Sequence, residues 1–396
     1  MVEHWPALLG AALWIAMLVT VVVRFRDSRR LDSYPATISS EIPLVSVVIP
    51  ARNEAHNITR CLTSVLTSGY PKFEVIVMDD HSTDGTGAIA ERIGAEDAAV
   101  HGGVSRVRVM TAAALPSGWF GKQWACHCGA QIARGDLLCF TDADTWHSPE
   151  LLTRSVNALR MRGAALFTVA SHQEMESFWE KVLQPFVFAI LLVRYGGLEG
   201  MSRSLNPYAK IANGQFMLIT RAAYAHSGGH EAVKSHVAED LRMAQRFASL
   251  RLPAHMVLAR DHMRTRMYTS LGEIRRGWGK NVYAAGRDAI PLNAVTRRIL
   301  PWIFPLPPLV PLVPIVFALL GWLGVLGPGA LIFGAIGCVA NLLFWLAAYA
   351  YSRLNPLWGL LYPVAAVMIA WIFAEAAWRG NRVAWRGRDY VSESAP

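Results

Sequence analysis

Acidic side chains stand directly after apolar runs at two places in the first half of the sequence. The run VIVM is followed by Asp79 and Asp80, and the run LLCFT is followed by Asp142 and, two residues later, Asp144. Proteins hold Mg²⁺ and Mn²⁺ with oxygen ligands, often one or two carboxylates together with phosphate oxygens. Asp142 and Asp144 are therefore candidate ligands for a divalent metal, whose charge would stabilise a diphosphate leaving group.

Each of these pairs also has a purely structural interpretation. Asp142 and Asp144 could shape a loop or cap the helix expected after Ser148-Pro149-Glu150. Asp79 and Asp80 precede the segment HSTDGT, where acidic residues commonly serve turns. Two adjacent carboxylates at a strand end repel each other, however, and this favours a role in binding the base or ribose hydroxyls of a nucleoside.

A third acidic pair, Glu239 and Asp240, begins the helical pattern in VAEDLRMAQRFASL. A carboxylate that faces a donor can remove the proton of an attacking hydroxyl, which is the requirement for transfer with inversion. The alternative is a favourable interaction between acidic side chains and a helix N-terminus. The pair taken alone favours that alternative.

The elements expected around these residues alternate between strand and helix. Strands are predicted at 44–49, 74–78, 106–110 and 137–141, and helices at about 55–68, 84–92 and 121–133. This alternation predicts an α/β domain with a parallel, doubly wound sheet, in which ligands bind beyond the C-terminal ends of the strands. The acidic pairs at Asp79 and Asp142 stand at those ends, as do Arg52 and Glu54 after the first strand.

The composition indicates a membrane protein. Hydrophobic residues make up 53% of the 396 residues and charged residues only 17%, against a usual ~25% charged. Residues 6–23 form an apolar run that is followed by Arg24, Arg26, Arg29 and Arg30. By the positive-inside rule the N-terminus lies outside and the following domain is cytoplasmic. The net charge of +9 suits anionic lipids and anionic substrates, and no motif indicates nucleic acid.

The C-terminal third contains three further candidate spans, at about 302–326, 329–350 and 357–377. Three spans after a cytoplasmic domain place the tail outside, whereas the arginines of the tail favour the inside. Those arginines are Arg379, Arg382, Arg386 and Arg388. Either the rule fails here or one segment does not cross, with the proline-rich 301–314 and the last segment as the two candidates.

Two other segments are candidates for the membrane interface. Residues 174–195 are rich in Trp, Phe, Leu and Val and predict either an interfacial helix or an ordinary buried one. Residues 263–299 combine arginines with aromatic residues and predict interfacial helices. The five cysteines include Cys126-His127-Cys128 but no CxxC pair, so reduced thiols are favoured over a zinc site.

Five segments, taken together and in order, resemble glycosyltransferase family 2. They are VSVVIPARNE (45–54), VIVMDDHSTDGT (75–86), GKQWACHCGA (121–130), LLCFTDADTWHSPELL (137–152) and VAEDLRMAQR (237–246). The resemblance covers roughly residues 44–262. It implies the GT-A fold, a Rossmann-like and mainly parallel sheet, an inverting mechanism, a nucleotide-sugar donor that is usually a UDP-sugar, and Mg²⁺ or Mn²⁺.

The resemblance also implies a role for each matching residue. Arg52 and Glu54 match positions that contact the nucleotide, Asp80 with its neighbour Asp79 matches the acidic uridine-binding position, and Lys122 matches the lysine of the family's G-K motif. Asp142 and Asp144 match the D-x-D motif, in which Asp144 is the favoured metal ligand and Asp142 also lies near the nucleotide. Asp240 matches the catalytic base.

Two later segments, 213–230 and 266–281, together with WRGRDY (385–390), resemble the narrower group of hopene-associated and carotenoid-type glycosyltransferases. Processive polysaccharide synthases carry a Q/R-x-x-R-W motif, which here is broken because Gly277 precedes Trp278 and Ile274 holds the first position. Side chains of this region are candidates for binding diphosphate or acceptor. They are Arg275, Arg276, Trp278 and Lys280, together with Glu239. The alternative is an Arg/Trp anchor at the membrane interface.

The predicted protein is an integral inner-membrane enzyme that transfers a sugar to a lipid or isoprenoid-type acceptor. Its expected parts are a transmembrane anchor at 1–23, a linker at 24–43, a cytoplasmic GT-A domain at 44–262, interfacial helices at 263–299, a transmembrane region at 300–378 and a basic tail at 379–396. A polysaccharide synthase is the alternative enzyme, and an inactive membrane scaffold or transport protein is the alternative of another class.

Overall fold

The computed structural model describes residues 5–26, 28–37, 41–288, 294–380, 382–385 and 388–391. Several arginines on which the sequence-based topology depends lie outside this description. They are Arg386 as a whole and the side chains of Arg24, Arg26, Arg382 and Arg388.

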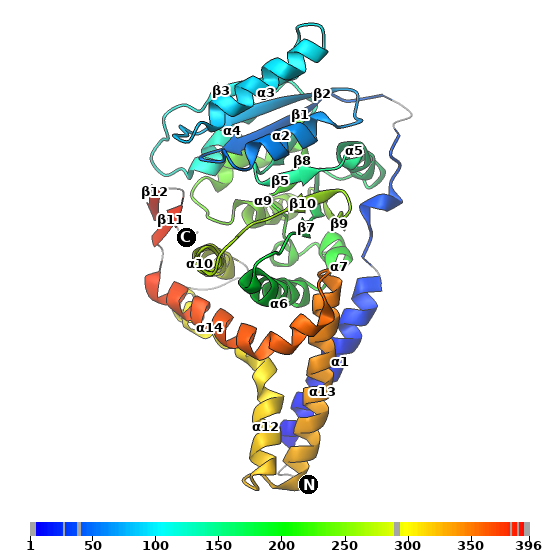
Figure 1. The fold of residues 1–396 in the computed structure, drawn as a ribbon, viewed down its shortest axis with the longest axis vertical. Helices are drawn as coiled ribbons and strands as arrows, with labels where there is room; N and C mark the ends of the chain where they lie inside the picture. Colours follow the sequence, from blue (N-terminus) through cyan, green and yellow to red (C-terminus); the bar gives the residue numbers. More distant parts are fainter. Residues whose placement is uncertain are drawn as a thin grey trace.

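A seven-stranded sheet with the order β3-β2-β1-β4-β8-β6-β9 forms the centre of the upper domain (Figure 1). Its strands are β1 (Val45–Ala51), β2 (Phe73–Asp79), β3 (Val107–Thr111), β4 (Leu137–Thr141), β6 (Leu166–Ala170), β8 (Phe216–Thr220) and β9 (Ala254–Leu258). Strands β1 to β4 are mutually parallel, whereas β8 runs antiparallel to both β4 and β6. The predicted mainly parallel sheet is therefore confirmed.

Helices cover both faces of this sheet, which explains why its strands are continuous apolar runs. The helices on one face are α2 (Ile58–Leu66), α3 (Thr86–Val100) and α5 (Leu151–Met161), and those on the other are α4 (Gly121–Ile132), α8 (Arg221–Ser227) and α9 (Glu239–Ser249). Helix α4 packs very closely on β1, because a Cβ atom at Gly129 would lie 2.4 Å from Val48 Cγ1. This contact fixes the start of α4 near the ends of the strands.

The segment expected as a polar linker is packed against the domain. Leu31, in the short 3-10 helix Leu31–Ser33, is fully buried, and Tyr34 is buried beside it. The Arg154 guanidinium donates hydrogen bonds to the backbone oxygens of Asp32 and Tyr34. These contacts hold the end of the first helix against the domain.

Three apolar helices project together from the domain as a bundle (Figure 1). They are α1 (Trp5–Arg26), α12 (Val313–Trp322) and α13 (Gly327–Tyr351). Helices α12 and α13 approach closely because glycine lies at their contact. A Cβ atom at Gly334 of α13 would lie 2.4 Å from the backbone nitrogen of Ala318 of α12. Leucine, isoleucine and valine side chains remain exposed along the outside of all three helices, as expected of surfaces that face lipid.

The last long helix, α14 (Tyr362–Arg379), does not run alongside the bundle but lies across its upper end, beneath α6 (Phe178–Tyr195) and α10 (Leu271–Asp288) (Figure 1). By length and composition four described segments could cross a membrane, namely 178–203, 299–322, 327–351 and 356–379. The structure divides these four segments into two groups. The segments with α12 and α13 belong to the bundle, whereas α6 and α14 pack between the domain and the bundle. The described residues that follow α14 therefore lie on the side of the domain, opposite the first residues of α1 (Figure 1).

Helix α6, within the residues 174–195, packs partly inside the protein. It begins with a capping box formed by Ser177 and Glu180, and the buried Glu180 carboxylate pairs with Arg266 at 2.9 Å. The Tyr349 hydroxyl of α13 donates a hydrogen bond to the backbone oxygen of Val182. One side of α6 thus packs in the protein, while Phe178 stays half exposed.

Two polar side chains of the apolar segments have structural partners. Asn341 of α13 donates a hydrogen bond of 2.6 Å to the backbone oxygen of Pro311, in the 3-10 helix η5 (Pro307–Leu312). Glu375 of α14 lies 3.7 Å from Arg275 of α10 and 3.5 Å from Arg379. The hydrogen bond joins α13 to η5, and the Arg275 contact joins α14 to α10.

The remaining elements connect these layers. They are β5 (Thr145–His147), β7 (His172–Gln173) and β10 (Met263–Thr265) in a small second sheet, the helices α7 (Leu198–Arg203), α11 (Ala294–Ile303) and η6 (Pro356–Leu361), and a hairpin of β11 (Arg382–Trp385) and β12 (Arg388–Val391).

Candidate active site

The ends of β1, β2 and β4 open into one large cavity of about 1570 Å³. Several residues predicted from the sequence line it together. They are Arg52, Glu54, Asp80, Lys122, Asp142, Asp144, Glu239 and Asp240. Register explains part of this convergence, because Ala51 at the end of β1 pairs with Asp79 at the end of β2 and so places Arg52 beside Asp80. The Arg52 guanidinium then donates a hydrogen bond to the backbone oxygen of Asp80 and lies 3.9 Å from its carboxylate.

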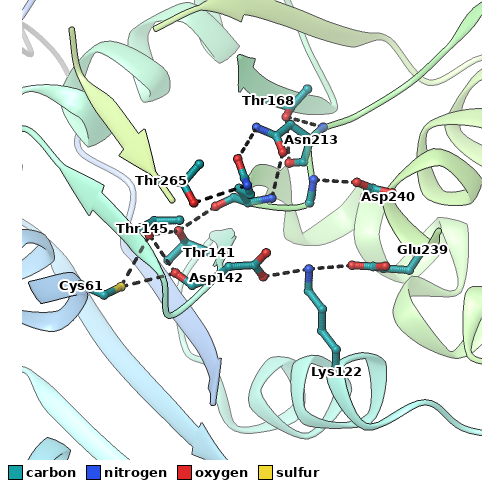
Figure 2. A network of polar contacts seen from close by, with 12 residues as sticks. Cys61, Lys122, Thr141, Asp142, Thr145, Thr168, Asn213, Glu239, Asp240 and Thr265 are labelled. Carbon is teal, nitrogen blue, oxygen red and sulfur yellow. Dashed lines mark hydrogen bonds and ion pairs between the residues drawn. The ribbon is translucent and has the colours of Figure 1, made fainter. Parts of the chain in front are cut away.

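Lys122 stands between two carboxylates at the centre of the cavity (Figure 2). Its Nζ atom lies 2.8 Å from Asp142 Oδ1 and 2.8 Å from Glu239 Oε1. Desolvation opposes its charge, but Asp142 and Glu239 outweigh this and raise the pKa of Lys122 well above its ordinary value. Because α4 begins at Gly121, the lysine lies in the first turn of a helix, where backbone N–H groups favour anions. This end of α4 is suited to a diphosphate.

Asp240 lies in the first turn of α9 and is held by two backbone donors. Its Oδ2 accepts a hydrogen bond of 2.9 Å from the backbone N–H of Gly214, and its Oδ1 accepts one of 2.7 Å from Leu241. Desolvation and the neighbouring Glu239 raise the pKa of Asp240 to about 6, although Lys122 opposes the shift. A fixed carboxylate with a raised pKa has the properties of a general base.

We expect the pH dependence of kcat/KM to report this shift. The base must be ionised to accept a proton, so kcat/KM should rise tenfold per pH unit below about pH 6, the pKa of Asp240, and level off above it. An ordinary aspartate, with a pKa near ~4, would place the same rise about two pH units lower. Initial rates at subsaturating donor, in buffers of constant ionic strength, measure the midpoint. A plateau that extends unchanged down to pH 5 would assign proton removal to another group.

The two carboxylates of the D-x-D motif fit a divalent metal that binds together with its substrate. Asp142 and Asp144 line the same cavity. In the described part of the chain no group of three or more His, Cys, Asp or Glu residues is placed to hold a metal by itself. Mg²⁺ and Mn²⁺ are commonly bound by one or two carboxylates plus substrate phosphates, which is the donor set available here.

Helix α10 distributes the residues of the broken motif among three environments. Arg276 and Lys280 line the cavity, and Lys280 lies close enough to interact electrostatically with Glu239. Desolvation lowers the pKa of Lys280. Arg275 instead faces α14, where it pairs with Glu375 and lies over the Trp371 ring. The expectation that Arg275 binds diphosphate or acceptor is thus corrected, since successive residues of a helix point in different directions.

Trp278 is largely a packing residue, with its ring against Phe188 at 5.6 Å and Tyr268 at 6.2 Å between centroids. Position 277 requires glycine for a steric reason. A Cβ atom there would lie only 2.2 Å from the Tyr268 ring. The ring of Tyr268 itself lines the cavity. The residue that breaks the synthase motif is therefore one that makes room for an aromatic wall of the site.

The expectation for Asp79 is also corrected. Its Oδ1 accepts a hydrogen bond from the backbone N–H of Ser82, and its Oδ2 faces Gly87 of α3, so that it braces the turn and does not line the cavity. Consecutive residues of a strand point to opposite sides, and only Asp80 reaches the site.

The segment 213–230 also contributes to the site, although the sequence pattern singled out no residue in it. The structure places Gly214 in contact with the centre of the site, where a Cβ atom would lie 3.1 to 3.2 Å from Asp240, Glu239 and Lys122. Gln215 follows, and its backbone oxygen accepts a hydrogen bond of 2.8 Å from Thr141, next to Asp142 (Figure 2). The sequence signal for these residues is the triplet Asn213-Gly214-Gln215, which stands directly before β8.

Comparisons with known proteins agree with this geometry. Residues 46–227 match the family described as Glycosyl transferase family 2. The 4,4'-diaponeurosporenoate glycosyltransferase of Staphylococcus haemolyticus is 27% identical over 252 residues, which are 62% of this chain and 63% of that protein. The protein of the same name from Staphylococcus aureus strain MRSA252 is 25% identical over 302 residues, 74% of this chain and 76% of that one.

A solved mannosyltransferase from Pyrobaculum calidifontis, in complex with GDP-Man and Mn²⁺, has the same fold. The TM-score is 0.51 at 18% identity, over 95% of this chain and 98% of that one. The sheet of this chain, with the cavity at its strand ends, therefore has the GT-A fold. The family matched by residues 46–227 and the carotenoid-type names of the staphylococcal relatives agree with the resemblance found in the sequence.

Proposed function

We propose that this glycosyltransferase moves a sugar from a nucleotide-sugar, in the first instance a UDP-sugar, to a lipid or isoprenoid-type acceptor, with inversion. The observation that carries the proposal is the ion cluster of Lys122 with Asp142 and Glu239 beside Asp240, in a cavity that continues into the membrane part. The names of the staphylococcal relatives support an acceptor of the diaponeurosporenoate kind for those enzymes. For the present chain we extend only the isoprenoid character of that acceptor, and we assign a hydroxyl as the attacking group.

On the donor side, Asp80 with Arg52 is assigned to the nucleoside, and Lys122 to the diphosphate. A divalent metal held by Asp142 and Asp144, Mg²⁺ or Mn²⁺, would supply counter-charge to the leaving diphosphate. Binding of the anionic donor would draw Lys122 away from Asp142, because both groups then have new partners. Lys280 adds a second positive charge to the same space. The site thus concentrates positive charge where the leaving group becomes more negative.

On the acceptor side, Asp240 is assigned the proton of the acceptor. Its carboxylate removes this proton while the acceptor oxygen attacks the anomeric carbon, and the bond from that carbon to the diphosphate oxygen breaks. The two backbone donors from Gly214 and Leu241 keep the carboxylate oriented for this step. The proton therefore ends on Asp240, and the nucleoside diphosphate leaves.

We further propose that α1, the segment 299–322 that ends with α12, and α13 cross the inner membrane, with the catalytic domain in the cytoplasm. In this arrangement α14 lies at the cytoplasmic surface and returns the chain to the side of the domain. This removes the conflict between three C-terminal spans and a basic tail, because only two of the three C-terminal segments cross. Arg29, Arg30 and Arg353, which follow α1 and α13, also lie at the cytoplasmic end.

Labelling of engineered cysteines in intact cells tests this topology. Val104 and Val325 are both highly exposed, Val104 in the catalytic domain and Val325 in the turn between α12 and α13. We expect Val325→Cys to react with a membrane-impermeant maleimide from outside and Val104→Cys to react only after lysis. The unsubstituted protein, with its five cysteines, gives the background. Labelling of Val104→Cys in intact cells would contradict the cytoplasmic assignment.

The proposed reaction is tested with purified enzyme, a panel of radiolabelled nucleotide-sugars and extracted membrane lipids. We expect label in short glycolipids that partition into organic solvent. Label in long, water-soluble chains would instead support the polysaccharide-synthase alternative. No transfer and no donor hydrolysis with any nucleotide-sugar would favour an inactive scaffold, which the intact set of acidic residues speaks against.

A further inference from the structure

The cavity at the strand ends has two arms of opposite character. One arm is formed by the charged residues described above. The other, here called the apolar arm, is walled by helices of the membrane part. Its lining includes Trp14 of α1, Phe188 of α6, Phe304 just after α11, Trp345 and Ala348 of α13, and Phe373 of α14. The space is continuous, and its 1570 Å³ exceeds the roughly 300–1,000 Å³ of a site for one small ligand.

We propose that the apolar arm binds the hydrocarbon chain of the acceptor and holds its polar head at Asp240 while the chain stays within the protein. This inference rests on the proposed function and adds to it the place of the acceptor. The occupant is one linear amphiphile, because α1, α6, α13 and α14 wall the arm with apolar side chains and the arm leads to a charged cluster that suits only a polar head. A second protein segment would leave its backbone polar groups unsatisfied in such a space.

Helix α10 joins the two arms. Lys280 interacts with the charged cluster, and Trp278, two residues earlier, packs against Phe188 of the apolar arm. The Trp278 Nε1–H lines the same cavity and is buried, with no hydrogen-bond partner in the described part of the chain. A buried donor of this kind is costly unless something accepts its hydrogen bond. An oxygen of the acceptor's head group at the junction would do so.

Aromatic rings give the apolar arm a rigid wall. The Trp345 ring is stacked on Phe186 at 4.3 Å between centroids and on Tyr362 at 6.0 Å. Trp14 packs edge-on against Phe344 at 5.6 Å. Because these rings are fixed by one another, the space beside them does not collapse when it is empty. A preformed apolar channel costs the acceptor little reorganisation on binding.

Two alanines offer a way to fill the arm without touching the charged cluster. Ala348 of α13 and Ala189 of α6 both line the cavity and are buried. Ala350 lies on the same helix as Ala348 but is exposed and does not line the cavity. Ala350→Phe is therefore a matched control for Ala348→Phe, and Ala189→Phe is a second, independent test from the facing helix.

The experiment compares a long-chain isoprenoid alcohol with its one-unit analogue, both bearing the same hydroxyl. We expect Ala348→Phe and Ala189→Phe to lower kcat/KM for the long acceptor about tenfold or more, since the added ring occupies the space of the chain. Donor hydrolysis and transfer to the short analogue should stay within twofold of wild type, as should all activities of Ala350→Phe. A wild-type enzyme that glycosylates neither alcohol and no membrane lipid would overturn the proposed function itself.

If the filled variants keep the wild-type preference for the long acceptor, the function stands and the apolar arm is not its binding site. A photoreactive long-chain alcohol gives a readout that does not depend on turnover. We expect it to label peptides of α6 or α13 in the wild-type enzyme, with less labelling in Ala348→Phe. Labelling confined to the exposed outer faces of α1 and α12 would overturn the proposal.

Discussion

Asp240→Asn is expected to lower kcat by about 10²–10⁴-fold, the usual contribution of a positioned general base, while donor binding changes little. The asparagine keeps the shape of the side chain and can still accept a hydrogen bond from the backbone N–H of Gly214 or Leu241. It cannot take the acceptor's proton. The measurements are single-turnover transfer at saturating donor and nucleotide affinity by calorimetry.

The matched control is Asp79→Asn. Asp79 was also predicted from the sequence to belong to the site, but its carboxylate braces a turn through Ser82. The amide oxygen of asparagine can accept the same hydrogen bond, so transfer should stay near the wild-type rate. Weaker donor binding with normal turnover in Asp240→Asn would show that Asp240 binds substrate and that another group removes the proton.

Asp144→Ala is expected to have the second large effect, a loss of transfer of at least about 10²-fold. The substitution removes one of the two carboxylates of the metal pair, and the departing diphosphate loses counter-charge. Nucleotide affinity measured with and without Mn²⁺ should show a metal-dependent gain for wild type that the variant lacks. Treatment of wild type with EDTA should reproduce the loss, and added Mn²⁺ should reverse it.

The two variants fail in different ways, which separates the metal from the base. Asp240→Asn should keep the metal-dependent gain in nucleotide affinity, whereas Asp144→Ala should lose it. Full transfer by wild type in EDTA would mean that Lys122 and Lys280 alone neutralise the diphosphate. In that case the D-x-D motif would serve mainly to hold Lys122 through Asp142.

Local sequence patterns were sufficient to predict the α/β sheet and to place several candidate site residues at its edge. Continuous apolar runs predicted strands buried on both faces, and their alternation with helical patterns predicted a parallel sheet. Arg52, Asp80 and Asp142 then had to meet, because the C-terminal ends of parallel strands lie at one edge. Lys122 and Asp240 were identified through motif resemblance, since their distance from the strand ends cannot be derived from local periodicity.

Other features depended on contacts between residues far apart in the sequence. Asp79 and Asp80 are indistinguishable by type, and only the turn packed against α3 directs one away from the cavity. Arg275 and Lys280 share one helix, and the position of α14 decides that the first pairs with Glu375. The position of Gly214 in the site could not be predicted from the sequence, because it depends on the loop of Gly214 passing beside α9.

The membrane part shows the same division. Hydropathy by itself determined which segments are apolar enough to span a bilayer, because that property depends only on length and composition. It could not determine that α14 lies across the bundle while α12 and α13 run along it, since helix direction is set by packing against neighbours. The continuity of the charged site with the apolar arm is likewise a product of tertiary structure, because its walls come from helices more than three hundred residues apart in the chain.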